Sequence, residues 1–210
     1  MQHNIIITGV GGQGVVTLGL LLSSTAISCG ERAIMSEIHG LAQRGGSVSV
    51  DVRIGNYHAP IIPDGMADLI VALEPLETLR AISRAGPLTA VVMGEESLPP
   101  VSLGIHRKEY PDVDEISRII SERYRFYRID ALKIAREAGD PRAVNTTIAG
   151  YMVGLGLVSM PAPKFLEEIE RSFSQKYINI NKKAFELGLD NGVLVKEQSA
   201  KRVNLQAGLS

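Results

Sequence analysis

Residues 4–14 read NIIITGVGGQG, a short run of β-branched residues that ends in a cluster of glycines. A short apolar run closed by glycine predicts a buried strand. Residues 13–28 are apolar nearly all round, which predicts a helix packed against a sheet, and Gly30 follows where a helix-ending glycine is expected. A strand that turns through glycines into a buried helix is typical of the start of an α/β fold.

The rest of residues 1–140 alternates short apolar runs with helical patterns. We expect further strands at 33–36, 48–54, 68–73, 88–93 and 125–129, a helix starting at Glu74-Pro75, and helices at 115–123 and 131–138. This alternation predicts a doubly wound, mostly parallel, Rossmann-like α/β sheet. Within 48–54, polar and aliphatic residues alternate, which predicts a strand near the sheet edge or a cleft with one solvent-exposed face.

Beyond Pro141 the pattern is helical, with helices expected at 144–158, 163–174 and 177–188. We interpret residues 141–190 as a C-terminal helical cap on a sheet core of residues 1–140, so that 1–190 form a single domain. Residues 191–210 form a tail of low apolar content, mobile or ordered by a partner. Gly150, Gly154 and Gly156 favour close helix packing over partner contact.

The composition excludes several classes of function. With 22 Lys+Arg against 23 Asp+Glu, the net charge of −1 gives no attraction to nucleic acid or anionic membranes. A single cysteine, Cys29, cannot supply a disulfide, a four-thiolate zinc site or an iron–sulfur cluster. The longest apolar stretch, 148–158, is shorter than the roughly 20 residues that span a bilayer. We therefore expect a cytoplasmic protein without nucleic-acid, membrane or metal binding.

The first loop, residues 9–14, lies where the first strand turns into a helix. Glycines let the backbone approach a ligand closely, and N–H groups at a helix start attract anions. A Walker A loop is excluded because Val15 stands where lysine is required. Packing of the helix on the sheet is the alternative role for the glycines. The residues predicted to bind a phosphate or another anion are Gly9, Gly11, Gly12, Gln13 and Gly14.

The second loop, residues 38–47, reads IHGLAQRGGS and follows Glu37. Glu37 stands about where a dinucleotide site has its ribose-binding acid, roughly 20 residues after the glycines. The loop itself brings an imidazole, an amide, a guanidinium and a hydroxyl together, which suits anions or a partner surface. The alternative is an ordinary connection with a turn at its paired glycines. The residues of this stretch that could meet an anion or a partner are Glu37, His39, Gln43, Arg44, Gly45, Gly46 and Ser47.

Together the two loops resemble the gamma-type domain of the 2-oxoacid:ferredoxin oxidoreductases. The segment SEIHGLAQRGGS at 36–47 is most similar to the branch that acts on indolepyruvate and related aryl 2-oxo acids, and the resemblance extends to NKKAFELG at 181–188. It implies an enzyme subunit of amino-acid catabolism that is inactive alone. In this family thiamine diphosphate attacks the 2-oxo carbon, [4Fe–4S] clusters carry electrons to ferredoxin, and coenzyme A accepts the acyl group.

The sequence lacks four cysteines and the Gly-Asp-Gly…Asn-Asn pattern of a thiamine diphosphate–magnesium site. The resemblance therefore implies that thiamine diphosphate, magnesium and the [4Fe–4S] clusters lie on a larger alpha subunit, in an expected α2β2 assembly. The chain alone would hold no cofactor and would complete the active site in trans. On this reading the second loop lines the entrance for the substrate or coenzyme A, with His39, Gln43 and Arg44 as catalytic residues and Glu37, Gly45, Gly46 and Ser47 as cofactor-binding residues. Two alternatives stay open: a stand-alone NAD(P)- or FAD-binding oxidoreductase, and a non-catalytic subunit that stabilises its partner.

Overall fold

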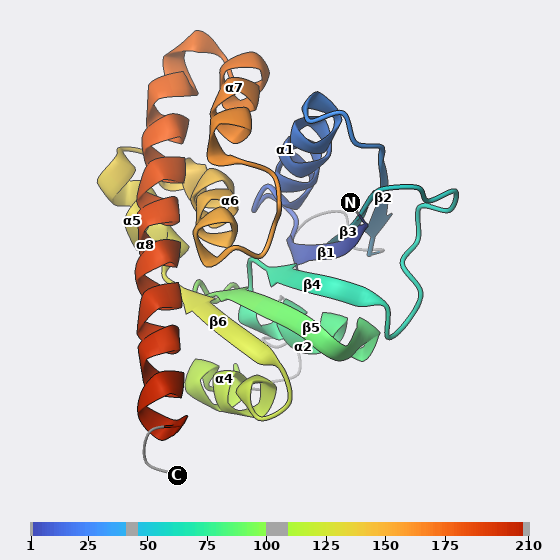
Figure 1. Ribbon diagram of the computed structural model, residues 1–210, viewed down its shortest axis with the longest axis vertical. Coiled ribbons are helices and arrows are strands. Elements are labelled where there is room, and N and C mark those ends of the chain that lie inside the picture. Colours follow the sequence, from blue (N-terminus) through green and yellow to red (C-terminus); the bar gives the residue numbers. More distant parts are fainter. Residues whose placement is uncertain (1, 41–45, 100–108, 208–210) are drawn as a thin grey trace. The chain divides into compact units, whose positions relative to one another are not determined.

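The computed structural model describes residues 2–40, 46–99 and 109–207 (Figure 1). The chain divides into two compact units, residues 1–131 and residues 132–210. The first unit contains the sheet, and the second is helical. The prediction of a single domain made of residues 1–190 stays a prediction.

The first unit is an α/β sheet with the strand order β2-β3-β1-β4-β5-β6. Its strands are β1 (His3–Val10), β2 (Ala33–His39), β3 (Ser47–Ile54), β4 (Ala67–Ala72), β5 (Ala85–Gly94) and β6 (Arg125–Ile129). Its helices are α1 (Val15–Ser28), α2 (Pro75–Ala81), the 3₁₀ turn η1 (Ile82–Arg84) and α4 (Val113–Ser121). The pairs β1–β4, β4–β5 and β5–β6 are parallel, whereas β3 is antiparallel to both β1 and β2. The predicted mostly parallel α/β sheet is confirmed.

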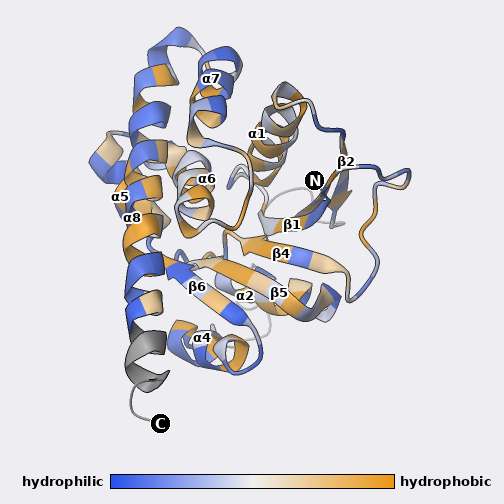
Figure 2. Ribbon diagram, viewed as in Figure 1, coloured by the Kyte–Doolittle hydropathy of each residue, from blue (hydrophilic) through white to orange (hydrophobic). Residues whose placement is uncertain are grey.

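The core of this unit lies along its central strands. Ile5, Ile6 and Ile7 of β1 are fully buried, and Figure 2 shows hydrophobic residues concentrated in β4 and β5. Helix α1 lies on one face of the sheet, and α2 and α4 lie on the other (Figure 1). Burial on both faces explains why these strands read as continuous apolar runs.

The predicted position of β3 near the sheet edge is confirmed, since only β2 lies beyond it, but the predicted solvent-exposed face is wrong: Ser49 is half-buried, and Asp51 and Arg53 are buried. Asp51 is fully buried and accepts two hydrogen bonds from Arg84, at 2.7 and 2.6 Å, and a third from the Ile62 amide at 2.8 Å. Arg53 donates to the side-chain oxygen of Asn4 at 2.9 Å. Hydrogen-bonded ion pairs offset the cost of burying these charges. The alternating polar residues of β3 therefore belong to a network of buried hydrogen bonds inside the protein.

The second unit contains the helices that follow the sheet. They are α5 (Ala131–Ala138), the 3₁₀ turn η2 (Pro141–Ala143), α6 (Val144–Leu155), α7 (Ala162–Ser172) and α8 (Gln175–Ala207). Helix α8 is much longer than the predicted helix at 177–188 and includes most of the expected tail. Gly188, the last residue of the predicted helix, packs inside the helix pair and does not end α8.

Helices α6 and α8 approach closely through glycines. A Cβ atom at Gly150 of α6 would overlap the carbonyl oxygen of Phe185, and one at Gly188 of α8 would overlap that of Thr147. The predicted packing role is confirmed for Gly150. Gly156 has a different role, since it ends α6 in the left-handed conformation with φ 73°.

Candidate functional site

The first loop and the two described ends of the second loop lie at the carboxyl edge of the sheet. In the strand register His39 of β2 pairs with Val48 of β3, which pairs with Gly9 of β1. The Gly11 amide donates to the Gly46 carbonyl at 2.9 Å, so the described parts of the two loops are in direct contact. In α/β sheets ligands bind at this edge, where the connections from neighbouring strands run to opposite sides, as they do after β1 and β4.

The first loop has the backbone conformation that its glycines predict. Gly12 and Gly14 have φ values of 99° and 83°, which L-residues with side chains rarely adopt. Gly14 is the N-cap of α1 and gives no side-chain hydrogen bond, and the first turn of α1 has no acidic residue. This helix start therefore offers uncapped N–H groups and a positive dipole end, the arrangement that attracts an anion.

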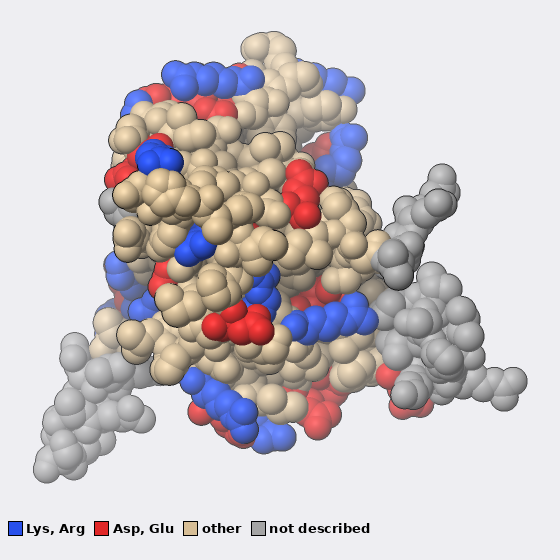
Figure 3. All heavy atoms as spheres, turned by 90° about the vertical axis from the view of Figure 1, so that its right-hand side faces the viewer, with Lys and Arg blue, Asp and Glu red and all other residues tan. Residues whose placement is uncertain are grey.

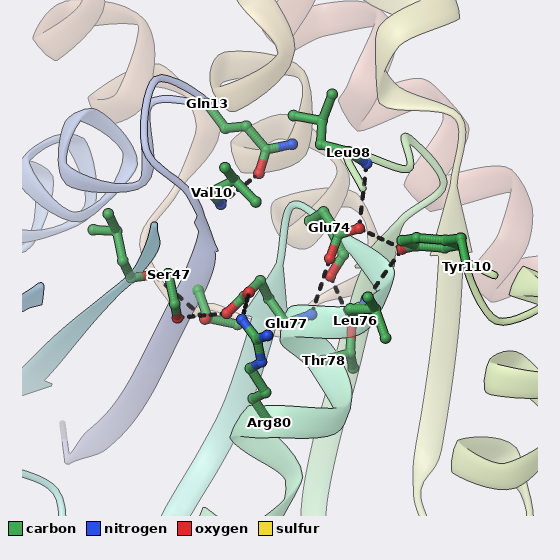
Figure 4. A network of polar contacts seen from close by, with 12 residues as sticks. Val10, Gln13, Ser47, Glu74, Leu76, Glu77, Thr78, Arg80, Leu98 and Tyr110 are labelled. Carbon is green, nitrogen blue, oxygen red and sulfur yellow. Dashed lines mark hydrogen bonds and ion pairs between the residues drawn. The ribbon is translucent and has the colours of Figure 1, made fainter. Parts of the chain in front are cut away.

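The side chain of Gln13 is engaged within the protein. Its amide oxygen accepts from the Val10 amide at 2.8 Å (Figure 4). Its amide nitrogen donates to the Leu73 carbonyl at 3.2 Å. Gln13 therefore closes the first loop and fastens it to the residue that follows β4. Its predicted role in ligand binding becomes indirect, through the shape of the loop.

Ser47 also makes an internal contact. Its hydroxyl donates to a carboxylate oxygen of Glu77 at 2.5 Å, and Arg80 forms an ion pair with the other oxygen (Figure 4). Glu77 is only 2% exposed. This buried carboxylate of α2 holds the end of the second loop, a contact that the sequence reasoning missed.

Glu74 is the second buried carboxylate at this edge. It is the N-cap of α2, is 1% exposed, and accepts from the Glu77 amide at 3.0 Å and the Leu98 amide at 3.3 Å. The hydroxyl of Tyr110 donates to the same carboxylate. Burial, followed by the hydrogen bond to Glu74, raises the pKa of Tyr110 above its ordinary range. The predicted helix start at Glu74-Pro75 is confirmed, and a capping acid followed by another acid three residues on was the available signal.

Glu37 and His39 lie on the edge strand β2, where their side chains are exposed and contact each other at 3.1 Å. A dinucleotide-binding sheet has its acidic residue on the strand next to β1. Here β3 separates β2 from β1. The geometry therefore does not favour the NAD(P) or FAD alternative. Gln43, Arg44 and Gly45 lie outside the described residues.

The comparison with protein families decides the class of this chain. The model of the pyruvate ferredoxin/flavodoxin oxidoreductase family matches residues 4–191. The chain belongs to this family. The predicted resemblance is thereby confirmed, and the comparisons give no support to a stand-alone dinucleotide-binding oxidoreductase.

Curated members of the oxidoreductase family align with nearly the whole chain. The protein named indolepyruvate oxidoreductase subunit IorB of Methanothermobacter thermautotrophicus is 35% identical, over 90% of this chain and 96% of its own length. Its namesake in Pyrococcus horikoshii is 36% identical, over 90% of this chain and 95% of its own.

Solved structures share the fold of this family. The gamma subunit of a keto/oxoacid ferredoxin oxidoreductase from Geobacter sulfurreducens has a TM-score of 0.67 at 20% identity, over 91% of this chain and 99% of that one. The 2-oxoglutarate:ferredoxin oxidoreductase of Magnetococcus marinus, solved with coenzyme A bound, has a TM-score of 0.72 at 18% identity. It aligns with 92% of this chain and 31% of its own.

In Figure 3, the Lys and Arg side chains are interspersed with Asp and Glu on the face shown. Among the described residues, no helix combines the length and apolar character that crossing a membrane requires. The same residues contain no group of three or more His, Cys, Asp or Glu placed to hold a metal ion.

Proposed function

We propose that this chain is the smaller subunit of an oxidoreductase that converts indolepyruvate, or a related aryl 2-oxo acid, to an acyl-CoA and passes the electrons to ferredoxin. The observation that carries this proposal is the alignment with subunits named for indolepyruvate oxidation, which covers almost their entire length. The convergence of both glycine-bearing loops at the carboxyl edge of the sheet supports it.

The chain's own residues do not fit the redox and thiamine groups of such an enzyme. Cys29 is the sole cysteine of the sequence and is exposed, whereas a [4Fe–4S] cluster needs four thiolates. No Gly-Asp-Gly…Asn-Asn pattern exists for thiamine diphosphate and magnesium. We therefore assign these groups to a larger alpha subunit, in a cytoplasmic α2β2 assembly.

Coenzyme A or the 2-oxo acid is the ligand that this chain would meet, and both carry anionic groups. The uncapped start of α1 fits an anion, since first-turn N–H groups favour negative charge by about 0.3–1 kcal/mol. Gly11, Gly12 and Gly14 would bring the backbone close to that group. Gly9 is buried in β1, where a Cβ atom would lie 2.9 Å from the side chains of Gln13 and Val15, so it serves packing. Arg44 would be the cationic partner, with His39 and Gln43 as hydrogen-bonding groups.

The direct test is to co-express the chain with its larger subunit and follow the coenzyme A-dependent reduction of ferredoxin by indolepyruvate, phenylpyruvate and pyruvate. The proposal predicts a preference for the aryl substrates, and no activity from either subunit alone. Full activity of the larger subunit alone would favour the non-catalytic stabilising role. Tight NAD, NADP or FAD binding by the isolated chain, together with hydride transfer, would favour the stand-alone oxidoreductase.

A further inference from the structure

We propose that Glu77, acting through Ser47, is a positioning residue that holds the two loops together at the proposed site. The inference rests on the proposed function for its kinetic consequence. Its structural part, the coupling of the two loops, rests on the contacts of α2 alone.

The first step is the burial of Glu77. A carboxylate that is 2% exposed is costly unless partners compensate it, and its partners are the Ser47 hydroxyl and an arginine, Arg80, whose side chain is 52% exposed. Glu74 already caps the start of α2 through the Glu77 amide. The two carboxylate oxygens of Glu77 accept from Ser47 and Arg80, and the hydrogen bond with Ser47 joins α2 to β3.

The second step is the path from Ser47 to the first loop. Gly46 precedes Ser47 in the chain, and its carbonyl accepts from the Gly11 amide at 2.9 Å. On the other side, Gln13 bonds the carbonyl of Leu73, the residue before Glu74. The contacts form a closed ring, which runs through Gly11, Gly46, Ser47, Glu77, Glu74, Leu73 and Gln13.

The third step concerns what Ser47 can still offer to a ligand. A serine hydroxyl has one proton, and here that proton is donated to Glu77. Ser47 is therefore unable to donate to a phosphate or carboxylate without breaking this contact. Its role is to fix the backbone of Gly46 and so of Gly11, at the start of the segment where an anion would meet α1.

Hydrogen–deuterium exchange on the full chain tests the coupling. We expect Ser47→Ala and Glu77→Gln to accelerate exchange of the Gly11 amide by at least about threefold, since local opening governs such rates. Ser47→Thr, which keeps the hydroxyl, restores protection. Thr89→Ala is the matched control: this buried hydroxyl accepts from the Gly86 amide at 2.8 Å and donates to Ala67, at the opposite edge of the sheet. Unchanged exchange at residues 9–14 in both test variants would overturn the coupling.

Steady-state kinetics of the complex with the larger subunit test the consequence. We expect Ser47→Ala to raise the KM for coenzyme A or for the 2-oxo acid by about threefold or more, with a smaller change in kcat, because binding geometry is what the ring maintains. Ser47→Thr keeps the wild-type KM, and Thr89→Ala lowers only thermal stability. A wild-type KM in Ser47→Ala would overturn the positioning role. A wild-type complex inactive on aryl 2-oxo acids would instead overturn the proposed function, and exchange at Gly11 would still decide the coupling.

Discussion

Gly12 of the first loop and Gly150 of the α6–α8 pair serve opposite physical purposes. Gly12 has a φ of 99°, and a Cβ atom placed there would meet nothing within 4 Å. Gly150 is helical, and a Cβ atom there would overlap the carbonyl of Phe185. The loop needs a backbone conformation, whereas the helix pair needs space. Substitutions in the loop should therefore alter function, and substitutions in the helix pair should alter folding.

The largest effect is expected from Gly150→Ala. Because α6 and α8 must separate to admit the methyl group, we expect the free energy of unfolding to fall by more than about 4 kcal/mol, or soluble protein to be lost. Thermal unfolding and soluble yield measure this. Gly156→Ala on the same helix is the control, since its Cβ would meet only the flexible end of Lys196 and its cost is the left-handed conformation, about 1 kcal/mol. Equal losses in the two variants would contradict the distinction.

The next effect in size concerns the second loop. Arg44→Ala should lower the turnover of the complex at least tenfold, on the order of 1.4 kcal/mol, because an anionic substrate group loses its cationic partner. Arg32→Ala is the control, an exposed arginine before β2 that donates to Asn56 at 2.7 Å. Wild-type turnover in an Arg44→Ala complex of normal thermal stability would count against the proposed role.

A matched pair of glycines sharpens the comparison further. Gly12 and Gly30 both have positive φ values, 99° and 82°, and a Cβ atom at either would meet nothing within 4 Å. We expect Gly12→Ala and Gly30→Ala each to cost about 1 kcal/mol of stability, from backbone strain alone. Gly12→Ala alone should lower the activity of the complex, because Gly30 follows α1 at its other end. Loss of activity in both, or in neither, would refute a role for the loop conformation in function.

The smallest effect is a pH dependence at the opposite edge of the sheet. Burial lowers the pKa of His3 from its ordinary value of 6.5, an effect that Asp68 partly opposes. The folded state thus favours the neutral imidazole, so its contribution to stability is present above pH 6.5 and is lost as the pH falls below that value. The midpoint temperature of thermal unfolding should therefore change less between about pH 8 and about pH 5.5 in His3→Gln than in the wild type. An identical difference in both proteins would exclude His3 as a source.

Local sequence patterns predicted the strands and helices. The order of the strands and the burial of charged residues depend on contacts between residues far apart in the sequence, and these were not predicted. The apolar run before Gly9 and the proline after Glu74 are local signals, and both hold. The position of β3 between β2 and β1 could not be predicted from local sequence, because a short apolar strand can pair with its neighbours in either the parallel or the antiparallel direction. The burial of Asp51 depends on Arg84, which is distant in the sequence and gives no periodic signal.

The candidate site shows the same division. The glycines identified both loops, since their conformational freedom is a property of the residue itself. The roles of Glu74 and Glu77 at this edge were missed because a buried carboxylate reads as a surface residue until its partners are known, and Tyr110 was missed because only its contact with Glu74 gives it a role. The internal contact of Ser47 likewise becomes visible only when α2 is placed beside the start of β3.

The central claim is tested most directly by titrating the purified chain into its purified larger subunit and measuring ferredoxin reduction by indolepyruvate and coenzyme A. The account predicts no activity from either component alone, and a rise that saturates as the complex forms. Full activity of the larger subunit without this chain, or oxidation of 2-oxo acids by this chain alone, would contradict it.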